Sequence, residues 1–287
     1  MDGIVIIDKP QDWTSQDVVS KLRGVLHTKR IGHGGTLDPM ATGVLPVFVG
    51  RGTRAVEFFE HAEKTYEATL QLGLTTDTED IWGNTLEEKK AAVTKEDFLN
   101  ILPQFRGEIR QIPPMYSAIK INGQKLCNLA RKGKEVERPS RTVTIYELEC
   151  LEFDGTTAKL RVHCSKGTYI RTLCKDIGEA LGCGGCMAAL RRVTAGAYTI
   201  EEAVPLETIV NSQKPEDFLR PVDTVFAAYP AVKLTPNQEK RCRNGNSFSI
   251  TLEEGTYRAY SQNGEFLMLA NVESGVMSTI KSFFQVP

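Results

Sequence analysis

Residues Gly32–Pro39 read Gly-His-Gly-Gly-Thr-Leu-Asp-Pro, a loop that sets one carboxylate between glycines and a proline. Three glycines in four positions free the backbone to adopt positive φ and allow the close approach of a ligand. Pro39 disfavours the helical conformation at Asp38 and biases it toward extended geometry. Two interpretations follow: an ordinary Asp-Pro turn, or a loop that presents Asp38 to a bound molecule. The rest of the chain decides between them.

Length and composition bound the class of protein. A chain of 287 residues is longer than the usual single domain, which predicts one large domain with an accessory module. Hydrophobic content of 41% and charged content of 25% are typical of soluble globular proteins. No apolar run is long enough to span a bilayer, and the amino terminus lacks the pattern of a signal peptide. We therefore expect a cytoplasmic protein without membrane association, whose seven scattered cysteines are reduced thiols.

Charge is unevenly distributed along the chain, although the net charge is −1. Between residues 57 and 104 eleven acidic residues oppose four lysines, whereas between residues 120 and 141 seven basic residues oppose two glutamates. The basic stretch belongs to residues 112–141, which show little strand pattern and are predicted to form an inserted arm. A local basic excess is typical of a binding site for a polyanion, and equally of a solvated basic loop.

Periodicity predicts an α+β fold in the larger part of the chain. Thr14 and Asp17 form a capping-box pattern before an amphipathic helix, and Thr168 is predicted to open another helix that Gly182 ends. Residues 66–72 alternate between apolar and polar side chains, which is the pattern of a half-buried strand. Further strands are expected at 3–7, 44–49, 142–153 and 157–164, with a short helix at 55–60 and a capped helix at 94–102.

The pattern changes near residue 230. From there on, short strands separated by turns at Gly245, Gly255 and Gly264 predict a small β-rich unit. We therefore expect two domains, one formed by residues 1–229 and the other by residues 230–287.

Several common sites are excluded because their signatures are missing. The glycine-rich loop lacks the Lys-Ser/Thr ending of a phosphate-binding P-loop and the spacing of a dinucleotide-binding fingerprint. The four histidines have no metal-ligand spacing, and Cys183 and Cys186 lack the two further ligands that zinc needs. We expect no metal site and an inert pair of cysteines.

Two side chains outside the loop are candidates for chemistry. Arg171 lies in the first turn of the helix predicted after Thr168, where the positive helix end disfavours a cation. This placement indicates a partner such as a carboxylate, although an arginine that extends into water is the simpler interpretation. Tyr66 lies on the apolar face of its strand, where most tyrosines are core residues with a bonded hydroxyl. Residue types alone give neither side chain a role.

Six motifs in chain order resemble those of the bacterial tRNA pseudouridine synthases of the TruB type. Residues 32–45 resemble the GHxGTLDPxATGVL block of that family, its most specific segment. The other motifs are the opening strand with its Lys-Pro pair, K-x-Y, IPPxYSAxK, CSxGTYIR and LRR, found at residues 3–10, 64–66, 112–120, 164–171 and 190–192. Cys127 and Leu129 depart from the tyrosines usual in the basic arm of the family.

The resemblance implies a pseudouridine-synthase fold, in which helices flank a mixed, largely antiparallel sheet, followed by a β-rich RNA-binding module of the PUA type. It implies a cofactor-free isomerase that flips out the uridine at position 55 in the T-loop of tRNA. The enzyme would cleave the glycosidic bond of that uridine and rejoin the base through C5. The resemblance further implies a monomer that binds tRNA and needs no protein partner.

The resemblance also assigns the catalytic residues. Asp38 would be the essential carboxylate, which either attacks C1′ or removes the C2′ proton. Arg171 would pair with Asp38 and keep it ionised by lowering its pKa. Tyr66 would stack on the flipped base, with its hydroxyl near C5 for the final deprotonation.

Six further residues are implied to contact or support the substrate. They are His33, Tyr169, Leu190, Lys9, Lys120 and Arg131. His33 would fill the space left by the flipped nucleotide, Lys9 would support the loop, and Leu190 would form an apolar wall. Two other functions remain open: an RNA-binding or RNA-folding module with a vestigial pocket, and a related synthase that works with a guide RNA in a ribonucleoprotein.

Overall fold

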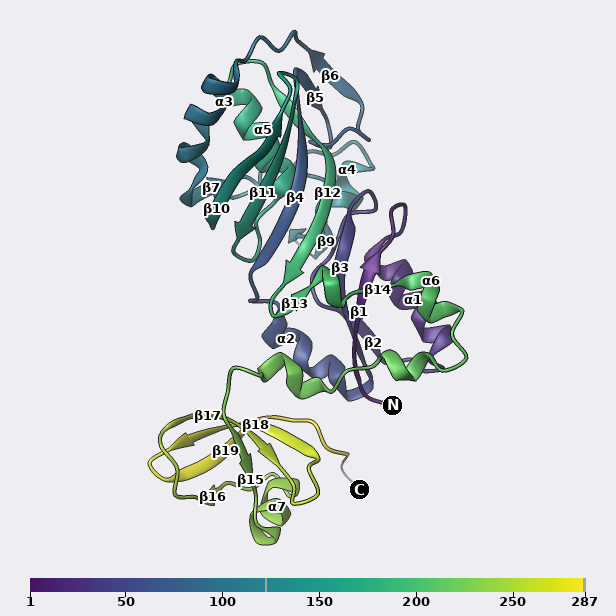
Figure 1. The fold of residues 1–287 in the computed structure, drawn as a ribbon, viewed down its shortest axis with the longest axis vertical. Helices are drawn as coiled ribbons and strands as arrows, with labels where there is room; N and C mark the ends of the chain where they lie inside the picture. Colours follow the sequence, from purple (N-terminus) through teal and green to yellow (C-terminus); the bar gives the residue numbers. More distant parts are fainter. Residues whose placement is uncertain (122, 286–287) are drawn as a thin grey trace.

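The structure is a computed structural model that describes residues 1–121 and 123–285. A large sheet with its helices forms the upper part of the elongated molecule in Figure 1, and a smaller sheet forms the lower part. The predicted arm and terminal domain include residues 122 and 286–287, which lie outside the described residues. Within the described part of the chain, no helix is long and apolar enough to cross a membrane.

Ten strands form the large sheet, which is mixed and largely antiparallel as predicted. Its main path runs β14-β1-β3-β12-β4-β11-β10-β7, and β2 and β13 pair with β3 and β12 beside that path. The parallel pairs are β1 with β14 and β3 with β12. The strands are β1 (Gly3–Lys9), β2 (Ile31–His33), β3 (Thr42–Val49), β4 (Lys64–Leu72), β7 (Gly107–Gln111), β10 (Arg141–Phe153), β11 (Thr157–Cys164), β12 (Gly185–Ala195), β13 (Tyr198–Thr199) and β14 (Val204–Pro205).

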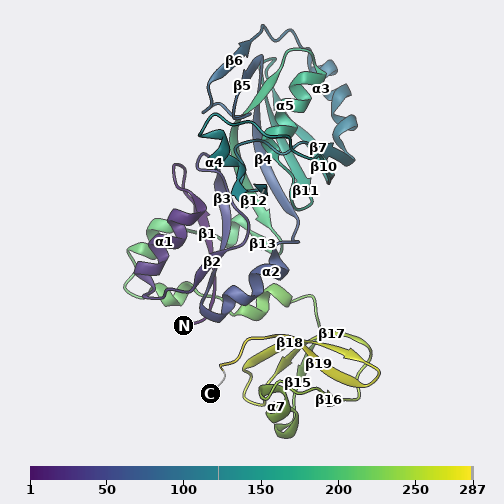
Figure 2. The same cartoon turned by 180° about the vertical axis from the view of Figure 1, so that it is seen from behind.

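Helices flank this sheet, as the two opposite views in Figures 1 and 2 show. The predicted capping box at Thr14 is present and precedes α1 (Ser15–Val25). The capped helix predicted at 94–102 is α3 (Lys95–Ile101), and Thr94 also forms a capping box at its start. The other helices are α2 (Val56–Phe59), α4 (Leu126–Ala130), α5 (Ile170–Ala180), α6 (Leu206–Val210) and α7 (Pro236–Arg243). Short 3-10 helices span Gly50–Ala55, Leu102–Phe105, Ile200–Glu202, Pro215–Phe218 and Val222–Phe226.

The start of α5 differs from the prediction. The helix begins after Tyr169, not at Thr168, and the Tyr169 side chain does not cap it. The Thr168 hydroxyl instead donates to the Ser165 carbonyl at 3.0 Å and so closes the loop before the helix. Gly182 follows the helix at φ +76°, the left-handed conformation expected of a terminating glycine.

The main core lies between the large sheet and its helices. The alternation in β4 buries Tyr66 and Leu70 on one face, as predicted, and Leu173 and Ile177 of α5 belong to the same cluster. Residues 4–7 of β1 are all apolar because the two faces of the strand contribute to different clusters. A strand with one solvated face would alternate instead.

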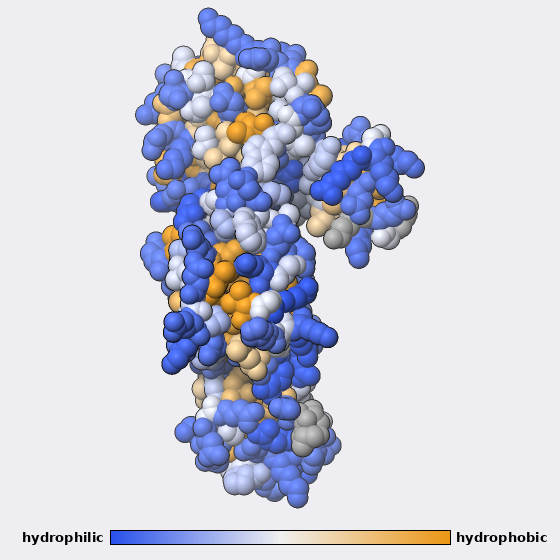
Figure 3. Space-filling model, turned by 90° about the vertical axis from the view of Figure 1, so that its right-hand side faces the viewer, coloured by the Kyte–Doolittle hydropathy of each residue, from blue (hydrophilic) through white to orange (hydrophobic). Residues whose placement is uncertain are grey.

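The predicted arm is mostly irregular, and it stands out as a hydrophilic lobe in Figure 3. Its regular structure consists of the two-residue strands β8 (Lys120–Ile121) and β9 (Gln124–Lys125), followed by α4. Part of the acidic stretch at residues 57–104 forms a hairpin of β5 (Leu74–Thr76) and β6 (Thr85–Glu88), which we call the acidic hairpin. Figure 1 places this hairpin at the end of the large sheet.

A five-stranded sheet in the order β15-β17-β18-β19-β16 forms the β-rich C-terminal region. Its strands are β15 (Ala231–Lys233), β16 (Phe248–Ser249), β17 (Gly255–Tyr260), β18 (Phe266–Glu273) and β19 (Val276–Ser282). Helix α7 was not predicted, although Thr235 and Gln238 form a capping box around Pro236 at its start. Gly245 therefore follows the end of a helix and does not separate two strands.

The C-terminal sheet packs on the larger part of the chain. Leu269 and Phe283 belong to one cluster with Phe226 and Phe48. The Phe226 and Phe283 rings lie 5.6 Å apart between centroids, and Arg54 donates to the Ser282 carbonyl at 2.8 Å. The contact is therefore both apolar and hydrogen-bonded.

Candidate active site

Asp38 opens a tight turn between β2 and β3. Its carbonyl accepts the Ala41 N–H at 3.0 Å, and Pro39 occupies the second position of the turn. The Pro39 carbonyl accepts the Asp12 N–H at 2.9 Å and the Lys9 ammonium at 3.3 Å. The two original interpretations are therefore compatible, because a firmly held Asp-Pro turn also aims the carboxylate.

The glycines of the loop serve the protein's own packing. Gly35 adopts φ +87°, which favours glycine. A Cβ on Gly34 would lie 2.5 Å from the Phe59 ring, whereas nothing lies within 4 Å of a Cβ on Gly32. The expectation that these glycines leave space for a ligand is wrong at Gly34, because Phe59 and Phe48 fill that space.

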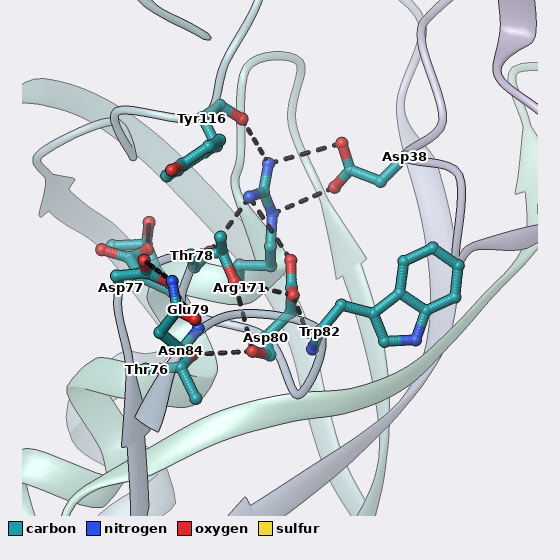
Figure 4. Close-up of polar contacts among 11 residues, drawn as sticks. Asp38, Thr76, Asp77, Thr78, Glu79, Asp80, Trp82, Asn84, Tyr116 and Arg171 are labelled. Carbon is teal, nitrogen blue, oxygen red and sulfur yellow. Dashed lines mark hydrogen bonds and ion pairs between the residues drawn. The ribbon is translucent and has the colours of Figure 1, made fainter. Parts of the chain in front are cut away.

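Asp38 and Arg171 form a two-point ion pair, drawn in Figure 4. Arg171 Nε lies 3.0 Å from Asp38 Oδ2, and Arg171 Nη2 donates to Asp38 Oδ1 at 3.3 Å. The arginine side chain is 5% exposed and that of Asp38 35%. The carboxylate expected to hold Arg171 at the helix start is therefore present, and the cation does not extend into water.

Backbone carbonyls complete the surroundings of Arg171. Nη1 donates to the Thr78 carbonyl at 3.1 Å, and Nη2 donates to the Tyr116 carbonyl at 2.8 Å. These groups come from the acidic hairpin and from the root of the arm. Arg171 thus joins the Asp38 loop, the hairpin and the arm at one point.

Burial and the ion pair shift the pKa of Asp38 in opposite directions. Burial raises the pKa of Asp38 above its ordinary value, and Arg171 opposes that rise. The charge of Arg171 thus lowers the pKa as predicted, but desolvation outweighs the ion pair and leaves the pKa of Asp38 raised. The site therefore contains a carboxylate that is more basic than a solvated aspartate.

Asp80 is a second carboxylate at Arg171, which the sequence interpretation missed. It is 7% exposed, and its Oδ2 lies 3.6 Å from Arg171 Nη1. Its Oδ1 accepts the Thr78 hydroxyl at 2.8 Å and the Trp82 N–H at 3.1 Å. The available signal was an acid within the Thr-Asp-Thr-Glu-Asp run at residues 76–80, in which several acids follow one another without a feature that singles out Asp80.

Tyr66 and Leu190 lie on adjacent strands of the sheet. Tyr66 is opposite Arg192 in the β4–β12 register, and Leu190 is opposite Ala68. Tyr66 is 9% exposed, and burial raises the pKa of its hydroxyl, while the charge of Arg192 opposes that rise. Both predicted residues thus sit in the sheet beneath the Asp38 loop.

Arg192 is another residue that the sequence interpretation left without a role. Its side chain is 1% exposed; Nε donates to the Val44 carbonyl at 2.7 Å, and Nη2 to the Gly35 carbonyl at 3.1 Å. Burial lowers the pKa of Arg192. This guanidinium fastens the glycine loop to the sheet beside Tyr66.

His33 and Tyr169 flank the site. His33 ends β2 beside Val47 of β3, and its buried Nδ1 has no hydrogen-bond partner within the described part of the chain. Burial lowers the pKa of His33, which favours the neutral ring. Tyr169 exchanges two hydrogen bonds with the Gln111 amide, at 3.0 and 3.2 Å, and so fixes the start of α5.

Lys120 and Arg131 lie apart from this cluster. Both are exposed on the arm, and no hydrogen bond or ion pair within the described residues joins either one to Asp38, Tyr66 or Arg171. The two cysteines of the Cys183–Cys186 pair are free and buried, and no group of three or more possible metal ligands occurs among the described residues.

A cavity of about 570 Å³ lies elsewhere, between β1, β14, α1 and α6. Its lining includes Trp13, Lys21, Arg191, Leu206 and Val210, but not the Asp38–Arg171 pair. Figure 3 shows an apolar patch on the corresponding face of the molecule. The lining also contains an acid and an arginine that pair at two points, Asp8 and Arg191 at 2.9 and 3.1 Å. The Arg191 side chain is 40% exposed, whereas that of Arg171 is 5% exposed.

Lys9 supports the loop from below, as expected. It is fully buried, and its ammonium donates to the carbonyls of Pro10 at 2.8 Å, Trp13 at 2.6 Å and Pro39 at 3.3 Å. Burial lowers the pKa of Lys9 to about 8, and the Asp38 charge opposes that effect. The three N–H groups of the Lys9 ammonium thus have three backbone carbonyls as acceptors, and the bond to Pro39 attaches the Asp38 turn to β1.

Substitution Lys9→Met is expected to lower the free energy of unfolding by about 2–4 kcal/mol, because it leaves buried carbonyls without donors. Urea denaturation measures the effect. Lys21→Met is the matched control, since Lys21 is an exposed lysine on α1, and it should change stability by less than about 0.5 kcal/mol. Equal stability of the two variants would contradict the supporting role of Lys9.

Two family models match the chain. The N-terminal domain of TruB family pseudouridylate synthases matches residues 23–170, and the C-terminal domain of tRNA pseudouridylate synthase B matches residues 171–227. The chain is 40% identical to tRNA pseudouridine synthase B of Clostridium kluyveri, over 99% of this chain and 100% of the relative. It is 42% identical to the protein of the same name from Stutzerimonas stutzeri, over 94% of this chain and 91% of the relative.

Two solved structures with a similar fold are of chains within multi-component complexes. A chain of a Cbf5-Nop10-Gar1 complex superimposes with a TM-score of 0.75 at 26% identity, covering 99% of this chain and 85% of the other. A chain of an H/ACA RNP bound to a substrate RNA containing 2′-deoxyuridine gives a TM-score of 0.74 at 23% identity, covering 99% and 86%. At 23% identity, the similarity to the H/ACA RNP chain shows a shared fold only.

Proposed function

This chain belongs to the TruB family of pseudouridylate synthases, and we propose that it converts the uridine at position 55 in the T-loop of tRNA to pseudouridine. Membership makes it an isomerase that acts on tRNA. The observation that carries the proposal is the carboxylate of Asp38, held on a tight turn and bound at two points by the buried Arg171. One such pair can suffice because uracil departs as a stabilised anion, without a second acid to protonate it.

The proposed chemistry leaves the substrate isomeric and needs no cofactor. The N1–C1′ bond breaks, the uracil turns, and a C5–C1′ bond forms. The proton lost from C5 is balanced by the proton gained at N1. Asp38 acts as an anion, either as nucleophile at C1′ or as base at C2′. Its burial supports both roles, because a carboxylate with a raised pKa is the stronger base and nucleophile.

Arg171 and Asp80 supply the charge balance that this mechanism needs. Arg171 favours the ionised form of Asp38 and so opposes the effect of burial on its pKa. When Asp38 becomes bonded or protonated during the reaction, the charge of Arg171 is still compensated by Asp80 at 3.6 Å. The buried Arg171 cation therefore has a carboxylate partner at every stage of the proposed reaction.

Tyr66 and Leu190 provide the proposed pocket for the flipped base. Unstacking a base in a folded T-loop costs energy, which stacking and apolar contact in the pocket offset. The Tyr66 ring would stack on uracil, with its hydroxyl near C5 for deprotonation. His33 would occupy the space that the base leaves, and its partly exposed ring, whose lowered pKa favours the neutral form, suits contact with neighbouring bases.

The arm and the C-terminal sheet are proposed to hold the RNA backbone. We assign residues 1–229 to the catalytic domain, with the arm at about 112–141, and residues 230–287 to a PUA-like RNA-binding domain. The change from the large sheet to the small one near residue 230 supports this division. We expect a cytoplasmic monomer that needs tRNA and no protein partner.

Mass spectrometry of an unmodified tRNA incubated with the purified protein tests this function. We expect one new pseudouridine, at position 55 in the T-loop, and none in a transcript with cytidine at that position. A pseudouridine outside the T-loop would contradict the proposed target. The absence of any pseudouridine would favour the RNA-binding or RNA-folding module.

A second candidate is a related synthase that works with a guide RNA in a ribonucleoprotein. The observation that favours it is the similarity to a chain solved in a complex with other proteins, the Cbf5-Nop10-Gar1 complex. The same incubation separates the two, because a stand-alone enzyme modifies tRNA without added RNA or protein. The 40% identity to a tRNA pseudouridine synthase B over the whole relative favours the stand-alone enzyme.

Removing either predicted arm cation should weaken binding through the RNA backbone. Lys120→Ala and Arg131→Ala are each expected to raise the Kd for tRNA several-fold and to reduce the slope of log K against log salt by about 1. The turnover rate at saturating tRNA should change little, because neither residue contacts Asp38. Filter binding from 50 to 300 mM salt measures the slope, and an unchanged slope would show that these residues do not contact phosphate.

A further inference from the structure

An exposed tryptophan lies at the tip of the acidic hairpin, next to the catalytic pair. Trp82 is 50% exposed, and the preceding Ile81 is 43% exposed. A single exposed apolar side chain is ordinary on a protein surface. Here two exposed apolar side chains follow one another beside the site that is proposed to accept a nucleobase.

The backbone at this position is tied to the catalytic pair. The Trp82 N–H donates to Asp80 Oδ1 at 3.1 Å, and Asp80 Oδ2 lies 3.6 Å from Arg171 Nη1. The Ile81 N–H donates to the Met187 carbonyl of β12 at 3.0 Å. Figure 4 shows the indole extending from this anchored backbone on the side of the view that holds Asp38.

The hairpin tip is held in one conformation. Glu79 adopts φ +64°, and its carboxylate accepts the Thr172 hydroxyl of α5 at 2.7 Å. A Cβ on Gly83 would lie 2.3 Å from the Thr78 hydroxyl oxygen, so the chain is closely packed directly after Trp82. A platform fixed in this way loses little conformational entropy when a ligand binds to it.

The acidic residues of the tip are occupied by internal partners. Asp77 accepts hydrogen bonds from the N–H and the side-chain amide of Asn84, at 2.8 and 2.9 Å. Glu79 lies 3.5 Å from the Lys175 ammonium, and Asp80 pairs with Arg171. Repulsion of an RNA backbone is thereby reduced, and the tip presents an aromatic face.

We propose that Trp82 stacks on a base of the bound tRNA next to the flipped uridine. This inference rests on the proposed function and adds a substrate contact to it. Flipping a base leaves its neighbours unstacked, and an aromatic platform replaces part of the lost stacking. The contact needs no particular base, because every base has a π face.

Binding and kinetics of Trp82 variants test the contact. Trp82→Ala is expected to raise the Kd for an unmodified T-arm stem-loop about 5- to 100-fold, the range that follows from the loss of one base–aromatic stack. Trp82→Phe should recover most of that loss. Leu86→Ala is the matched control, since Leu86 is 66% exposed on β6 of the same hairpin, and should change Kd less than about twofold.

Fluorescence gives a readout that a merely structural role would not change. The chain has two tryptophans, Trp13 and Trp82, so a Trp13→Phe variant reports on Trp82 alone. Addition of the T-arm stem-loop should quench that emission, because stacking brings the base against the indole. The midpoint of urea unfolding should be the same for Trp82→Ala and the unchanged protein, since the anchoring bond uses the backbone N–H.

The outcomes separate this inference from the function on which it rests. Unchanged Kd and unquenched emission, in a protein that still forms pseudouridine, would overturn the stacking contact and leave the isomerase assignment intact. A protein that binds the stem-loop and quenches Trp82 but forms no pseudouridine would retain the contact and overturn the proposed reaction.

Discussion

Substitution of Asp38 by asparagine is expected to abolish pseudouridine formation, with kcat lowered at least about 10⁴-fold. Asparagine keeps the size of the side chain but can act neither as an anionic nucleophile nor as a base. The turn should persist, because it is held by the carbonyls of Asp38 and Pro39 and by the buried Lys9. The Kd for tRNA is therefore expected to change by less than about threefold. Single-turnover assays with mass-spectrometric detection measure the rate, and filter binding measures Kd.

Asp12→Asn is the matched control for that substitution. Asp12 is an exposed residue near the same loop, and its positive φ of 67° is a conformation that asparagine tolerates well. The control removes one negative charge without touching Arg171 and should retain nearly full activity. If Asp38→Asn retained more than a few per cent of the rate, the role assigned to the carboxylate would be wrong.

Loss of Arg171 is expected to have the second-largest effect. Arg171→Ala should lower kcat at least about 10³-fold and lower the free energy of unfolding by about 3–5 kcal/mol. Both follow from burial, since the substitution leaves Asp38 and Asp80 near each other without their shared cation. The Kd for tRNA should rise much less than kcat falls. Equal losses of affinity and rate would contradict the ion-pair mechanism.

The pH profile distinguishes a charge effect from simple misfolding. Asp38 must be ionised to react, so kcat falls as pH falls through its pKa, which burial already raises above the ordinary value. Arg171 opposes that rise, and its removal therefore shifts the acid limb of the residual activity of Arg171→Ala toward higher pH. Arg171→Lys keeps the charge without the two-point geometry and should shift the limb less. An acid limb at the same pH in all three proteins would exclude this account.

Local patterns in the sequence predicted the elements that carry the site. The alternation in β4 placed Tyr66 on a buried face, and the Thr14 and Thr94 capping boxes marked two helix starts, because these features depend on near neighbours in the chain. The awkward position of Arg171 at a helix start indicated a carboxylate partner, which the structure contains.

Features that depend on distant contacts were not predictable from the sequence. Asp80 and Arg171 are in contact although they lie 91 positions apart in the chain, 171 minus 80. The local sequence does not distinguish Asp80 from the acidic residues around it. Arg192 is buried because the Val44 and Gly35 carbonyls meet it there, although a basic pair in isolation indicates a solvated surface. The net direction of the Asp38 pKa required knowledge of how deeply the loop is packed.

The carbonyl of Tyr116 connects the root of the arm to the Asp38–Arg171 pair through a hydrogen bond. It accepts a hydrogen bond from Arg171 Nη2, the nitrogen that also donates to Asp38 Oδ1. Any displacement at the root of the arm that moves this carbonyl alters the donors available to the carboxylate. The position of the arm and the hydrogen bonding of Asp38 thus depend on the same guanidinium. Under the proposed function, an RNA that binds the arm in the wrong position would leave Asp38 with weaker hydrogen bonds from Arg171. Discrimination between substrates could then be exerted at the rate of reaction as well as at binding.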